Sequence, residues 1–455
     1  MHHPVIFREY DIRGVYEKEF DLEFAEKLGR ALVTYIQKKS PVTKPRICIG
    51  YDARLSCPDI VKSLTKGLTE SGAHVIILGL VTTPVCYFST FTLENISGAI
   101  QVTGSHNPPE YNGFKISYKN SSLFGAEILA LQKIIDANEF GQGQGSQENF
   151  DIRPSYYRHH AKEFGQITNI PVVIDCGNGA AGSVARELFL AVGLTPNFLF
   201  EEPDGRFPNH HPDPTVEKNL VHLKQKVLET KAICGIGFDG DADRIGVVDH
   251  TGKMLYGDEL MVIIARAIIK KQPGSKIIGD VKCSDRLYKD IANQGGIPIM
   301  WKTGHSLVKE KIKIEHAPFG GEMSGHIFFA DRNFGYDDAP YAALRLIEIL
   351  AQTKKTIPQL LEGLPTAFNT PEIRIDTTEE KKLLIVEKMK EAFSVKSSEY
   401  TTNLIDGIRL SFTDGWALCR ASNTQPVLVL RYESSTEAGL QRIQSKVESI
   451  VQKYI

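Results

Sequence analysis

The stretch Arg46-Ile-Cys-Ile-Gly-Tyr-Asp52 is a short apolar run that ends in Gly and Asp. Two later segments repeat this pattern, Pro171-Val-Val-Ile-Asp-Cys-Gly-Asn178 and Lys276-Ile-Ile-Gly-Asp-Val-Lys282. After each comes a segment with helical periodicity, then a Gly and a second apolar run. This order predicts a strand, a helix and a parallel strand joined by a right-handed crossover. The predicted helices are 60–70, 183–191 and 285–293, and the second runs begin at His74, Leu194 and Ile297.

The three copies predict three α/β domains of similar build, each with its own buried parallel strands. A length of 455 residues agrees with several domains of about 150 residues each. After residues 365–371 the pattern changes to short strand-like runs between two charged helical segments. This pattern is typical of an α+β domain with an antiparallel sheet.

Composition predicts where these domains end. The segment Gly141-Gln-Gly-Gln-Gly-Ser-Gln147 has the composition of a flexible linker, and a second break is expected near Gly252-Lys253. A last boundary, and a candidate hinge, lies at residues 365–371. We therefore expect four domains: residues 1–150, 151–253, 254–367 and 368–455.

The composition is that of an ordinary globular protein, with 42% hydrophobic and 24% charged residues. It excludes collagen-like, disordered and coiled-coil classes. A formal charge of -2 disfavours nucleic acid and anionic membranes as partners. Seven cysteines without a zinc-binding spacing favour a reducing cytoplasm over a disulfide framework.

Residues 71–93 carry no charged side chain and are long enough to span a bilayer. However, Gly79, Thr82, Thr83 and Pro84 divide the stretch into a strand, a turn and a further segment, which favours buried parallel-sheet structure. The N-terminus reaches the charged pair Arg8-Glu9 before any apolar core, so it does not have the pattern of a secretory signal.

The first loop with chemical potential is Thr103-Gly-Ser-His-Asn-Pro-Pro-Glu-Tyr-Asn-Gly-Phe-Lys115. We interpret Ser105, between Gly104 and His106, as an exposed hydroxyl whose direction is fixed by Pro108 and the proline that follows it. The alternative is a plain proline turn with a solvated serine, because short motifs have a high false-positive rate.

The second loop is Phe238-Asp-Gly-Asp-Ala-Asp-Arg244, between two apolar strands. The carboxylates of Asp239, Asp241 and Asp243 are expected to converge, and their repulsion is relieved if a cation lies among them. Oxygen ligands without His or Cys favour magnesium, and the spacing does not fit a calcium-binding EF-hand. A solvated acidic turn is the alternative.

Two further loops carry polar groups at the ends of apolar runs. In Gly320-Gly-Glu-Met-Ser-Gly-His326, the alternate residues Glu322, Ser324 and His326 would point the same way in extended backbone and suit sugar hydroxyls. In Arg420-Ala-Ser-Asn-Thr-Gln-Pro426, an Arg, hydroxyls and an amide make an anion cradle suited to phosphate. A turn cluster and a structural hairpin are the respective alternatives.

With these four loops in this order, the whole chain resembles the α-D-phosphohexomutase family, and within it the bacterial phosphomannomutase/phosphoglucomutase group. The opening Phe7-Arg-Glu-Tyr-Asp-Ile-Arg-Gly14 also looks like a signature of this family. The resemblance implies a heart-shaped enzyme whose four domains each send one loop into a central cleft. It implies a reversible transfer of phosphate between positions 1 and 6 of mannose and/or glucose phosphate.

The resemblance also implies roles for individual residues. Ser105 matches the phosphoserine, and it would hold one Mg²⁺ together with Asp239, Asp241 and Asp243. The catalytic group would also include His106, Lys115, Arg13, Arg244 and His326. The residues matching substrate-binding positions are Tyr10, Lys282, His305, Glu322, Met323, Ser324, Gly325, His326, Arg420, Ser422, Asn423 and Thr424. Gln425 departs from the family pattern, in which Thr or Glu is frequent, and this leaves the fine geometry of the cradle open.

Physical argument supports parts of this assignment. Phosphoryl transfer needs neutralisation of spreading negative charge, which magnesium, Arg13 and Arg244 can supply around Ser105. Either Lys115, if neighbouring cations depress its pKa, or His326 can deprotonate the sugar hydroxyl, and we expect them to share the role according to substrate orientation. Hexose 1,6-bisphosphate is the implied intermediate and activator, and its reorientation requires a mobile last domain.

Other functions remain open at this stage. A phosphoglucosamine mutase is the nearest alternative, although Met323 and Asn423 look more like the mannose/glucose group. An aspartyl-phosphate phosphotransferase would use Asp239 as nucleophile, which would leave the Ser105 loop without a role. A binding module without turnover is a third alternative. We expect small sugar phosphates as partners, no nucleic acid or membrane, and a monomer in the cytoplasm.

Overall fold

The computed structural model describes residues 2–423 and 425–455. The chain divides into two compact units. The first unit contains residues 1–260 and 324–360, and the second contains residues 261–323 and 361–455. Each unit is described by itself.

The first unit begins with a seven-stranded sheet in the order β1-β5-β4-β2-β3-β7, with β6 added beside β5. β2 pairs in parallel with β3 and β4, whereas β5 is antiparallel to its neighbours. The predicted strand, helix and parallel strand at residues 46–80 are therefore confirmed. The elements are β1 Ile12–Val15, β2 Arg46–Tyr51, β3 His74–Leu80, β4 Ile96–Val102, β5 Tyr111–Tyr118, β6 Ser121–Ser122, β7 Ser146–Asn149, α1 Leu22–Lys39, α2 Cys57–Glu70, α3 Thr83–Thr92, α4 Ala126–Ala137 and a 3₁₀ turn Pro4–Ile6.

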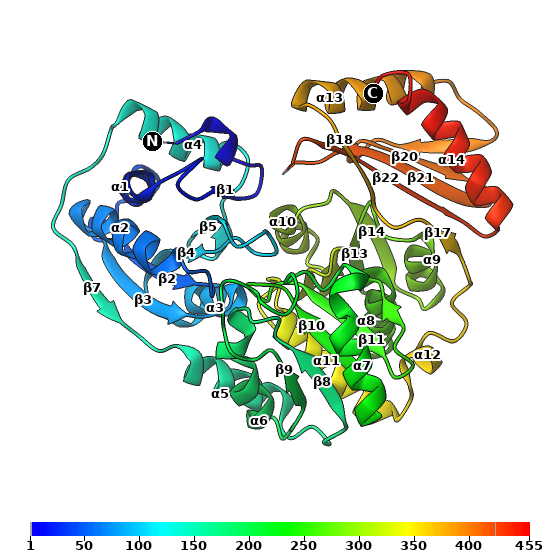
Figure 1. The fold of residues 1–455 in the computed structure, drawn as a ribbon, viewed down its shortest axis with the longest axis horizontal. Helices are drawn as coiled ribbons and strands as arrows, with labels where there is room; N and C mark the ends of the chain where they lie inside the picture. Colours follow the sequence, from blue (N-terminus) through cyan, green and yellow to red (C-terminus); the bar gives the residue numbers. More distant parts are fainter. Residues whose placement is uncertain (1, 424) are drawn as a thin grey trace. The chain divides into compact units, whose positions relative to one another are not determined.

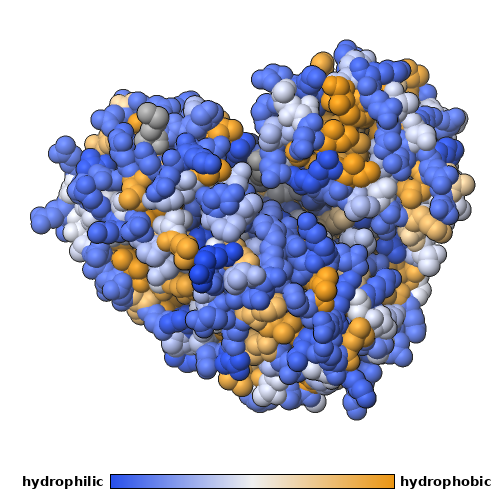
Figure 2. All heavy atoms as spheres, viewed as in Figure 1, coloured by the Kyte–Doolittle hydropathy of each residue, from blue (hydrophilic) through white to orange (hydrophobic). Residues whose placement is uncertain are grey.

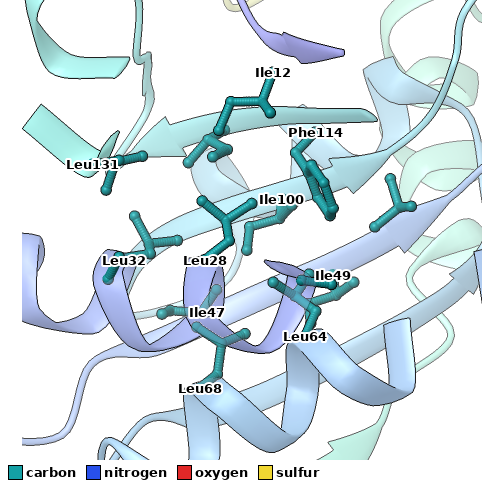
Figure 3. Close-up of a cluster of buried hydrophobic side chains, with 14 of the residues drawn as sticks. Ile12, Leu28, Leu32, Ile47, Ile49, Leu64, Leu68, Ile100, Phe114 and Leu131 are labelled. Carbon is teal, nitrogen blue, oxygen red and sulfur yellow. The ribbon is translucent and has the colours of Figure 1, made fainter. Parts of the chain in front are cut away.

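Helices α1 and α2 pack side by side (Figure 1) and cover the apolar side chains of this sheet. Figure 3 shows leucines of both helices, among them Leu28 and Leu64, close to Ile47 of β2, Ile100 of β4 and Phe114 of β5. Asp21 begins α1 by accepting a hydrogen bond from the backbone of the first helical turn. The core thus fixes the strands whose carboxyl ends carry the functional loops.

The end of the Gly/Gln-rich segment 141–147, predicted to be a flexible linker, is a β-strand in the structure. Its last residues belong to β7, which pairs in parallel with β3 at the edge of the sheet. A Cβ on Gly145 would lie 2.0 Å from the carbonyl oxygen of Ala73, so the glycine permits a close approach of two backbones. Gly145 therefore serves close packing of the backbone at this edge.

The second sheet of this unit has the order β12-β11-β10-β8-β9, and β8 is parallel to β9 and β10, as predicted. The helix expected at 183–191 is present as a helix over 185–191, and a 3₁₀ turn over 180–183 precedes it. The elements are β8 Val172–Asp175, β9 Asn197–Leu199, β10 Cys234–Phe238, β11 Ile245–Asp249, β12 Met254–Leu255, α5 Arg153–Phe164, α6 Ala185–Ala191, α7 Val221–Thr230 and 3₁₀ turns Ala180–Ser183 and Glu217–Leu220. The unit ends with β16 Ile327–Phe329, α11 Ala339–Thr353 and α12 Ile357–Leu360.

The second unit holds the third parallel motif and the C-terminal domain. β13 (Lys276–Asp280) pairs in parallel with β14 (Ile297–Trp301), as predicted, and with β15 (Phe319–Gly321). Helices α9 and α10 follow β13 and β14, and α8 precedes them. Their bounds are α8 Gly257–Lys271, of which residues 261 onward belong to this unit, α9 Asp285–Asn293 and α10 His305–Glu315.

The C-terminal domain has the antiparallel sheet that its sequence predicts. The strand order is β17-β22-β21-β20-β19, with β18 also beside β22. Helices α13 and α14 pack on the sheet around the buried residues Ile385, Met389 and Ile443. The bounds are β17 Phe368–Asn369, β18 Ile373–Asp376, β19 Tyr400–Asn403, β20 Ile408–Phe412, β21 Gly415–Ala421, β22 Val427–Ser434, α13 Glu379–Ala392 and α14 Glu437–Val451.

A buried arginine joins the C-terminal sheet to the third parallel motif within this unit. The Arg409 guanidinium lies 3.7 Å above the Trp416 ring and donates to the carbonyls of Val281 and, at 2.9 Å, Cys283. Ser284 also donates to Glu433 over 2.7 Å. A rotation of the C-terminal domain about the expected hinge at 365–371 would have to break these contacts.

Among the described residues, no helix is both long and apolar enough to cross a membrane. The uncharged stretch 71–93 forms β3, a turn and α3, in agreement with its sequence interpretation. On the face drawn in Figure 2, hydrophobic residues form separate groups within a mostly hydrophilic surface.

The buried His160 on α5 predicts an acid-sensitive fold. Both of its ring nitrogens lack a hydrogen-bond partner among the described residues, and burial, with His159 adding to it, lowers its pKa to about 3. Because the unfolded chain protonates this ring near pH 6.5, the stability from the neutral ring is lost as the pH falls below that value. Between pH 7.5 and pH 5 the loss is about 2 kcal/mol.

We expect H160F to lose about 2 kcal/mol less unfolding free energy over this pH interval than the wild type. Chemical denaturation at both pH values measures the difference. The control is H222F, because His222 is exposed on α7. Equal pH dependence in H160F and H222F would show that His160 is not the titrating group.

Candidate active site

Ser105 lies in the loop between β4 and β5, and its position differs from the sequence prediction. The residue is 2% exposed, so the expectation of an exposed hydroxyl is wrong. The cause is the close approach of the Asp239 turn: a Cβ on Gly240 would lie 2.5 Å from the Ser105 carbonyl oxygen. The Ser105 hydroxyl donates to Asp239 Oδ2 over 3.0 Å and lies 3.1 Å from His106 Nδ1.

Two basic residues, Arg13 and His106, lie at this loop. Arg13, on β1, donates to Asn107 Oδ1 over 3.2 Å and to Asp11 Oδ2 over 2.5 Å. Burial, together with the charges of Arg244 and Arg13, holds the pKa of His106 well below its ordinary value. His106 is therefore neutral at pH 7 and can exchange a hydrogen bond with the serine hydroxyl. Tyr10 is buried just before β1.

The three aspartates of the turn between β10 and β11 converge, as predicted. Asp239, Asp241 and Asp243 are fully buried, and each offers a carboxylate oxygen within 4.8 Å of the others. A positive φ of 58° at Ala242 helps the turn bring them together. Asp239 Oδ1 accepts the backbone N–H groups of Asp243 and Arg244, each over 3.0 Å, so this carboxylate also fixes the turn.

Lys115, on β5, supplies a cation to this cluster. Its ammonium donates to Asp241 Oδ2 over 2.6 Å and also contacts Asp243 Oδ2. The ammonium therefore relieves part of the carboxylate repulsion from which the sequence analysis inferred a metal.

The charges perturb one another strongly. Burial and then repulsion from Asp241 and Asp243 raise the pKa of Asp239 well above its ordinary value. Burial opposes ionisation of Asp241, but Lys115 and a hydrogen bond from Thr83 outweigh it and lower the pKa of Asp241.

Burial likewise opposes the charge on Lys115, but the aspartates outweigh it and raise its pKa. This direction is opposite to that required of a general base. Lys115 therefore acts as a base only if the charge of the aspartates is neutralised.

The cluster fits a hard divalent cation. Asp241 Oδ1 and Asp243 Oδ1 are buried and have no hydrogen-bond partner among the residues that the structure describes. A buried carboxylate oxygen without a partner is costly, and a cation relieves that cost. All the metal-ligand atoms that this cluster offers are oxygens, which is the ligand type that Mg²⁺ prefers.

His326 lies beside this cluster in the same unit. Its Nδ1 is 3.0 Å from Asp337 Oδ2 and 3.6 Å from Asp243 Oδ1. Arg244 Nε donates to His326 Nε2 over 3.0 Å, so Nε2 is the acceptor and Nδ1 carries the proton. Arg244 must release Nε2 before this nitrogen can accept a proton from a substrate hydroxyl.

Residues 322–326 are not the extended segment that their alternating pattern predicts. They form a turn between β15 and β16, and Gly325 has a φ of 86°. A Cβ on Gly325 would lie 2.5 Å from the Ile245 carbonyl, and this close packing requires the turn. Glu322 and Met323 belong to the second unit, whereas Ser324, Gly325 and His326 belong to the first.

In the second unit, Asp280 at the end of β13 connects the predicted substrate-binding residues. Its Oδ1 accepts the Met323 N–H over 3.2 Å, and its Oδ2 accepts the Thr303 hydroxyl over 2.8 Å. Buried Glu322 accepts the Gly304 N–H over 3.1 Å, immediately before His305 begins α10. These bonds place the loops after β13, β14 and β15 next to one another.

Lys282 adds a buried cation to this group. Its ammonium lies 3.2 Å from Glu372 Oε2. Burial opposes its charge, but Glu372 and Asp280 outweigh it and raise its pKa. Burial raises the pKa of Glu372, but Lys282 outweighs it and lowers that pKa to about 2. Lys282 is therefore charged near neutral pH and suits an anionic ligand.

The Arg420 loop is a hairpin between β21 and β22. Buried Arg420 donates through Nε to Asp406 Oδ2 over 3.0 Å. Lys382 from α13 donates to the carbonyls of Ser422 and Gln425 over 2.6 and 3.1 Å, and these hydrogen bonds stabilise the turn. Asn423 is exposed at the tip, and Thr424 lies outside the described residues. Gln425 contacts Arg374 through its side chain.

The structure therefore brings the predicted residues together within each unit. The first unit joins Ser105, His106, Lys115, the three aspartates, Arg244 and His326. In the second unit, Met323 donates to Asp280, Glu322 accepts from Gly304 next to His305, and Lys282 lies beside Glu372.

Six residues that contact these groups through hydrogen bonds or ion pairs were not predicted from the sequence. They are Asp52, Arg54, Thr83, Asp280, Asp337 and Asp406. The available signal was the Asp at the end of the repeated strand pattern, in Asp52 and Asp280. The others carry no local pattern, because their partners are distant in sequence.

Models of one enzyme family match nearly the whole chain. They are described as phosphoglucomutase/phosphomannomutase alpha/beta/alpha domain I at residues 4–142, domain II at 154–252, domain III at 256–368 and C-terminal domain at 372–450.

Curated relatives and a solved structure agree with the match to this family. A phosphomannomutase/phosphoglucomutase of Pseudomonas aeruginosa is 44% identical, over 97% of this chain and 94% of its own. A phosphoglucomutase of Neisseria gonorrhoeae is 40% identical, over 98% and 96%. The crystal structure of a phosphoglucomutase/phosphomannomutase family protein from Burkholderia thailandensis matches with a TM-score of 0.93, over 100% of this chain and 98% of that chain. The sequence identity of the two chains is 39%.

The metal assignment predicts a loss of magnesium affinity in D241N. The amide removes one negative charge and weakens the bond to Lys115, so we expect the dissociation constant for Mg²⁺ to rise about tenfold or more. Isothermal titration calorimetry of the apoprotein measures this. D249N is the control, because buried Asp249 accepts backbone N–H groups in the turn after β11 and does not belong to the cluster. Equal magnesium affinity in both variants would remove Asp241 from the ligand set.

Proposed function

The chain belongs to the phosphoglucomutase/phosphomannomutase family, and from this premise we propose that it moves phosphate reversibly between positions 1 and 6 of a hexose phosphate, mannose and/or glucose. The observation that carries the proposal is the bond of the Ser105 hydroxyl to Asp239, within a buried cluster of aspartates and cations. This cluster combines a nucleophile with groups that stabilise a transferring phosphoryl group.

The reaction begins with Ser105 phosphorylated. The free hydroxyl of a hexose monophosphate attacks the phosphorus, the bond to Ser105 Oγ breaks, and the hydroxyl proton passes to a base. The product, hexose 1,6-bisphosphate, reorients in the site. Ser105 Oγ then attacks the other phosphate and regenerates the phosphoserine, and the sugar oxygen regains a proton.

His326 and Lys115 share the proton transfers, according to the orientation of the sugar. The Nε2 of His326 accepts a proton once Arg244 turns to the phosphate. Lys115 serves when the negative charge of Asp241 and Asp243 is neutralised, because those carboxylates are what raise its pKa. Asp239, Asp241, Asp243 and the phosphorylated Ser105 would hold one Mg²⁺. When bound, the ion neutralises charge on the transferring phosphoryl group.

We assign recognition of the rest of the substrate to residues of the remaining predicted loops. Glu322, which accepts the N–H of Gly304 next to His305, would recognise sugar hydroxyls together with His305, Met323, Ser324 and Gly325. Lys282 and the Arg420 hairpin, with Ser422, Asn423 and Thr424, bind the phosphate that does not react. Tyr10 and Arg13 belong to the side that carries Ser105. The predicted monomeric state and cytoplasmic location stay predictions.

The central test is S105A. We expect its mutase activity with hexose 1-phosphate and catalytic hexose 1,6-bisphosphate to fall more than about a thousandfold, because no other residue replaces the attacking oxygen. A coupled assay of hexose 6-phosphate formation measures this. S89A is the control, since buried Ser89 donates to the carbonyl of Cys86 in its own helix. Wild-type turnover by S105A would refute the proposal.

The Arg420 hairpin is predicted to grip the non-reacting phosphate in both half-reactions. R420A removes a charged hydrogen-bonding partner, which costs about 1.5–3 kcal/mol of binding, or a factor of about 10–100 in kcat/KM in each direction. Steady-state kinetics in both directions measure the loss. R442A is the control, because Arg442 is half exposed and pairs with Asp414 elsewhere in the same domain. A lower Tm with unchanged KM values would identify the hairpin as merely structural.

A further inference from the structure

An ion pair that belongs to none of the four polar loops contacts the Ser105 loop. Asp52 and Arg54 follow β2, and both side chains are fully buried, with Arg54 Nε 3.1 Å from Asp52 Oδ2. Burying a charged pair is costly unless further hydrogen bonds satisfy both partners. The partners of this pair therefore indicate its purpose.

Arg54 donates to four carbonyl groups of one loop. Nη2 bonds to Ser105 and Asn107 over 2.9 and 2.6 Å. Nη1 bonds to Tyr111 over 2.8 Å and also contacts the carbonyl of Pro108. Four backbone carbonyls from residues 105–111 thus converge on one planar guanidinium.

Asp52 fixes the other side of the same loop. Its Oδ2 accepts the Thr103 hydroxyl over 2.7 Å and the Gly104 N–H over 3.2 Å. The Thr103 hydroxyl in turn accepts the Ser105 N–H over 2.7 Å. Both backbone groups of Ser105 are therefore held, directly or through one hydroxyl, by the Asp52–Arg54 pair.

These hydrogen bonds hold Ser105 in a backbone conformation that is unfavourable by itself. Ser105 has a φ of 50°, in the left-handed region that non-glycine residues rarely adopt. Gly104 has no room for a side chain, because a Cβ would lie 2.4 Å from Arg54 Cζ. Because Gly104 has no side chain, the loop can approach the Arg54 guanidinium closely. In this conformation the Ser105 hydroxyl donates to Asp239.

We propose that the Asp52–Arg54 pair is a positioning device that holds Ser105 in the left-handed conformation in which its hydroxyl accepts and donates the phosphoryl group. The inference rests on the proposed role of Ser105 as phosphoryl carrier. Arg54 makes its hydrogen bonds inside the first domain, to Asp52 and to the loop backbone, so its effect is on the reacting oxygen rather than on sugar binding.

The variant R54K tests the proposal, because lysine keeps the charge but cannot present a planar set of donors to four carbonyls. A misplacement of about 1 Å at a reacting atom costs about 100-fold in rate. We expect the phosphorylation of dephosphorylated enzyme by hexose 1,6-bisphosphate, followed by rapid quench and intact mass, to slow about 100-fold. The KM for hexose 1-phosphate should stay within about twofold of wild type.

The matched control is R345K. Arg345 is also a buried arginine of the first unit and makes a two-pronged ion pair with Asp331, away from the Ser105 loop. We expect R345K to lower Tm without slowing phosphorylation. A folded R54K that is phosphorylated within threefold of the wild-type rate overturns the proposal, as does equal slowing in R345K.

If R54K does not fold, T103V decides the question. Valine has nearly the same shape as threonine but removes the hydroxyl that links Asp52 to the Ser105 N–H. At least tenfold slower phosphorylation with unchanged KM supports the proposal, and a rate within twofold of wild type overturns it. In either variant a normal rate leaves the role of Ser105 intact, whereas phosphorylation of S105A at the wild-type rate would overturn the proposed function itself.

Discussion

Buried aspartates at the carboxyl ends of the three repeated strands hold the functional loops in place. Asp52 accepts hydrogen bonds from the Ser105 loop, Asp175 accepts from Gly177 and His210, and Asp280 accepts from Thr303 and Met323. A carboxylate in a dry interior requires several donors, and loops at the same edge of a parallel sheet supply them. The same constraint therefore stabilises the fold and positions the chemistry.

Within each unit, the buried cations of the predicted site residues are partly neutralised by carboxylates. Lys115 lies against two aspartates, Lys282 against Glu372, and Arg420 against Asp406. Each cation thus has a carboxylate partner that keeps it charged and oriented in a buried site. Under the proposed function, a phosphate dianion would compete with these carboxylates for the cations, and binding would exchange one set of charge pairs for another.

Much of the fold follows from local sequence. The apolar runs ending in Gly-Tyr-Asp52 or Gly-Asp280 predict parallel strands because burial on both faces requires continuous apolar side chains. The acidic turn 239–243 was also predictable, since three carboxylates at alternate residues of one turn repel one another unless a cation lies among them. Long-range contacts were not predictable: the burial of Ser105 depends on Gly240, and the edge strand β7 depends on Gly145, which approaches Ala73. The turn at 322–326 likewise depends on the distant Ile245.

The central claim is that Ser105, held from behind and hydrogen-bonded to Asp239, carries the phosphoryl group. The most direct measurement is tandem mass spectrometry of the protein after incubation with hexose 1,6-bisphosphate, which locates the phosphate on the chain. The account predicts a single acid-stable phosphate on Ser105. A hydroxylamine-labile phosphate on Asp239, or no phosphorylated residue at all, would contradict it.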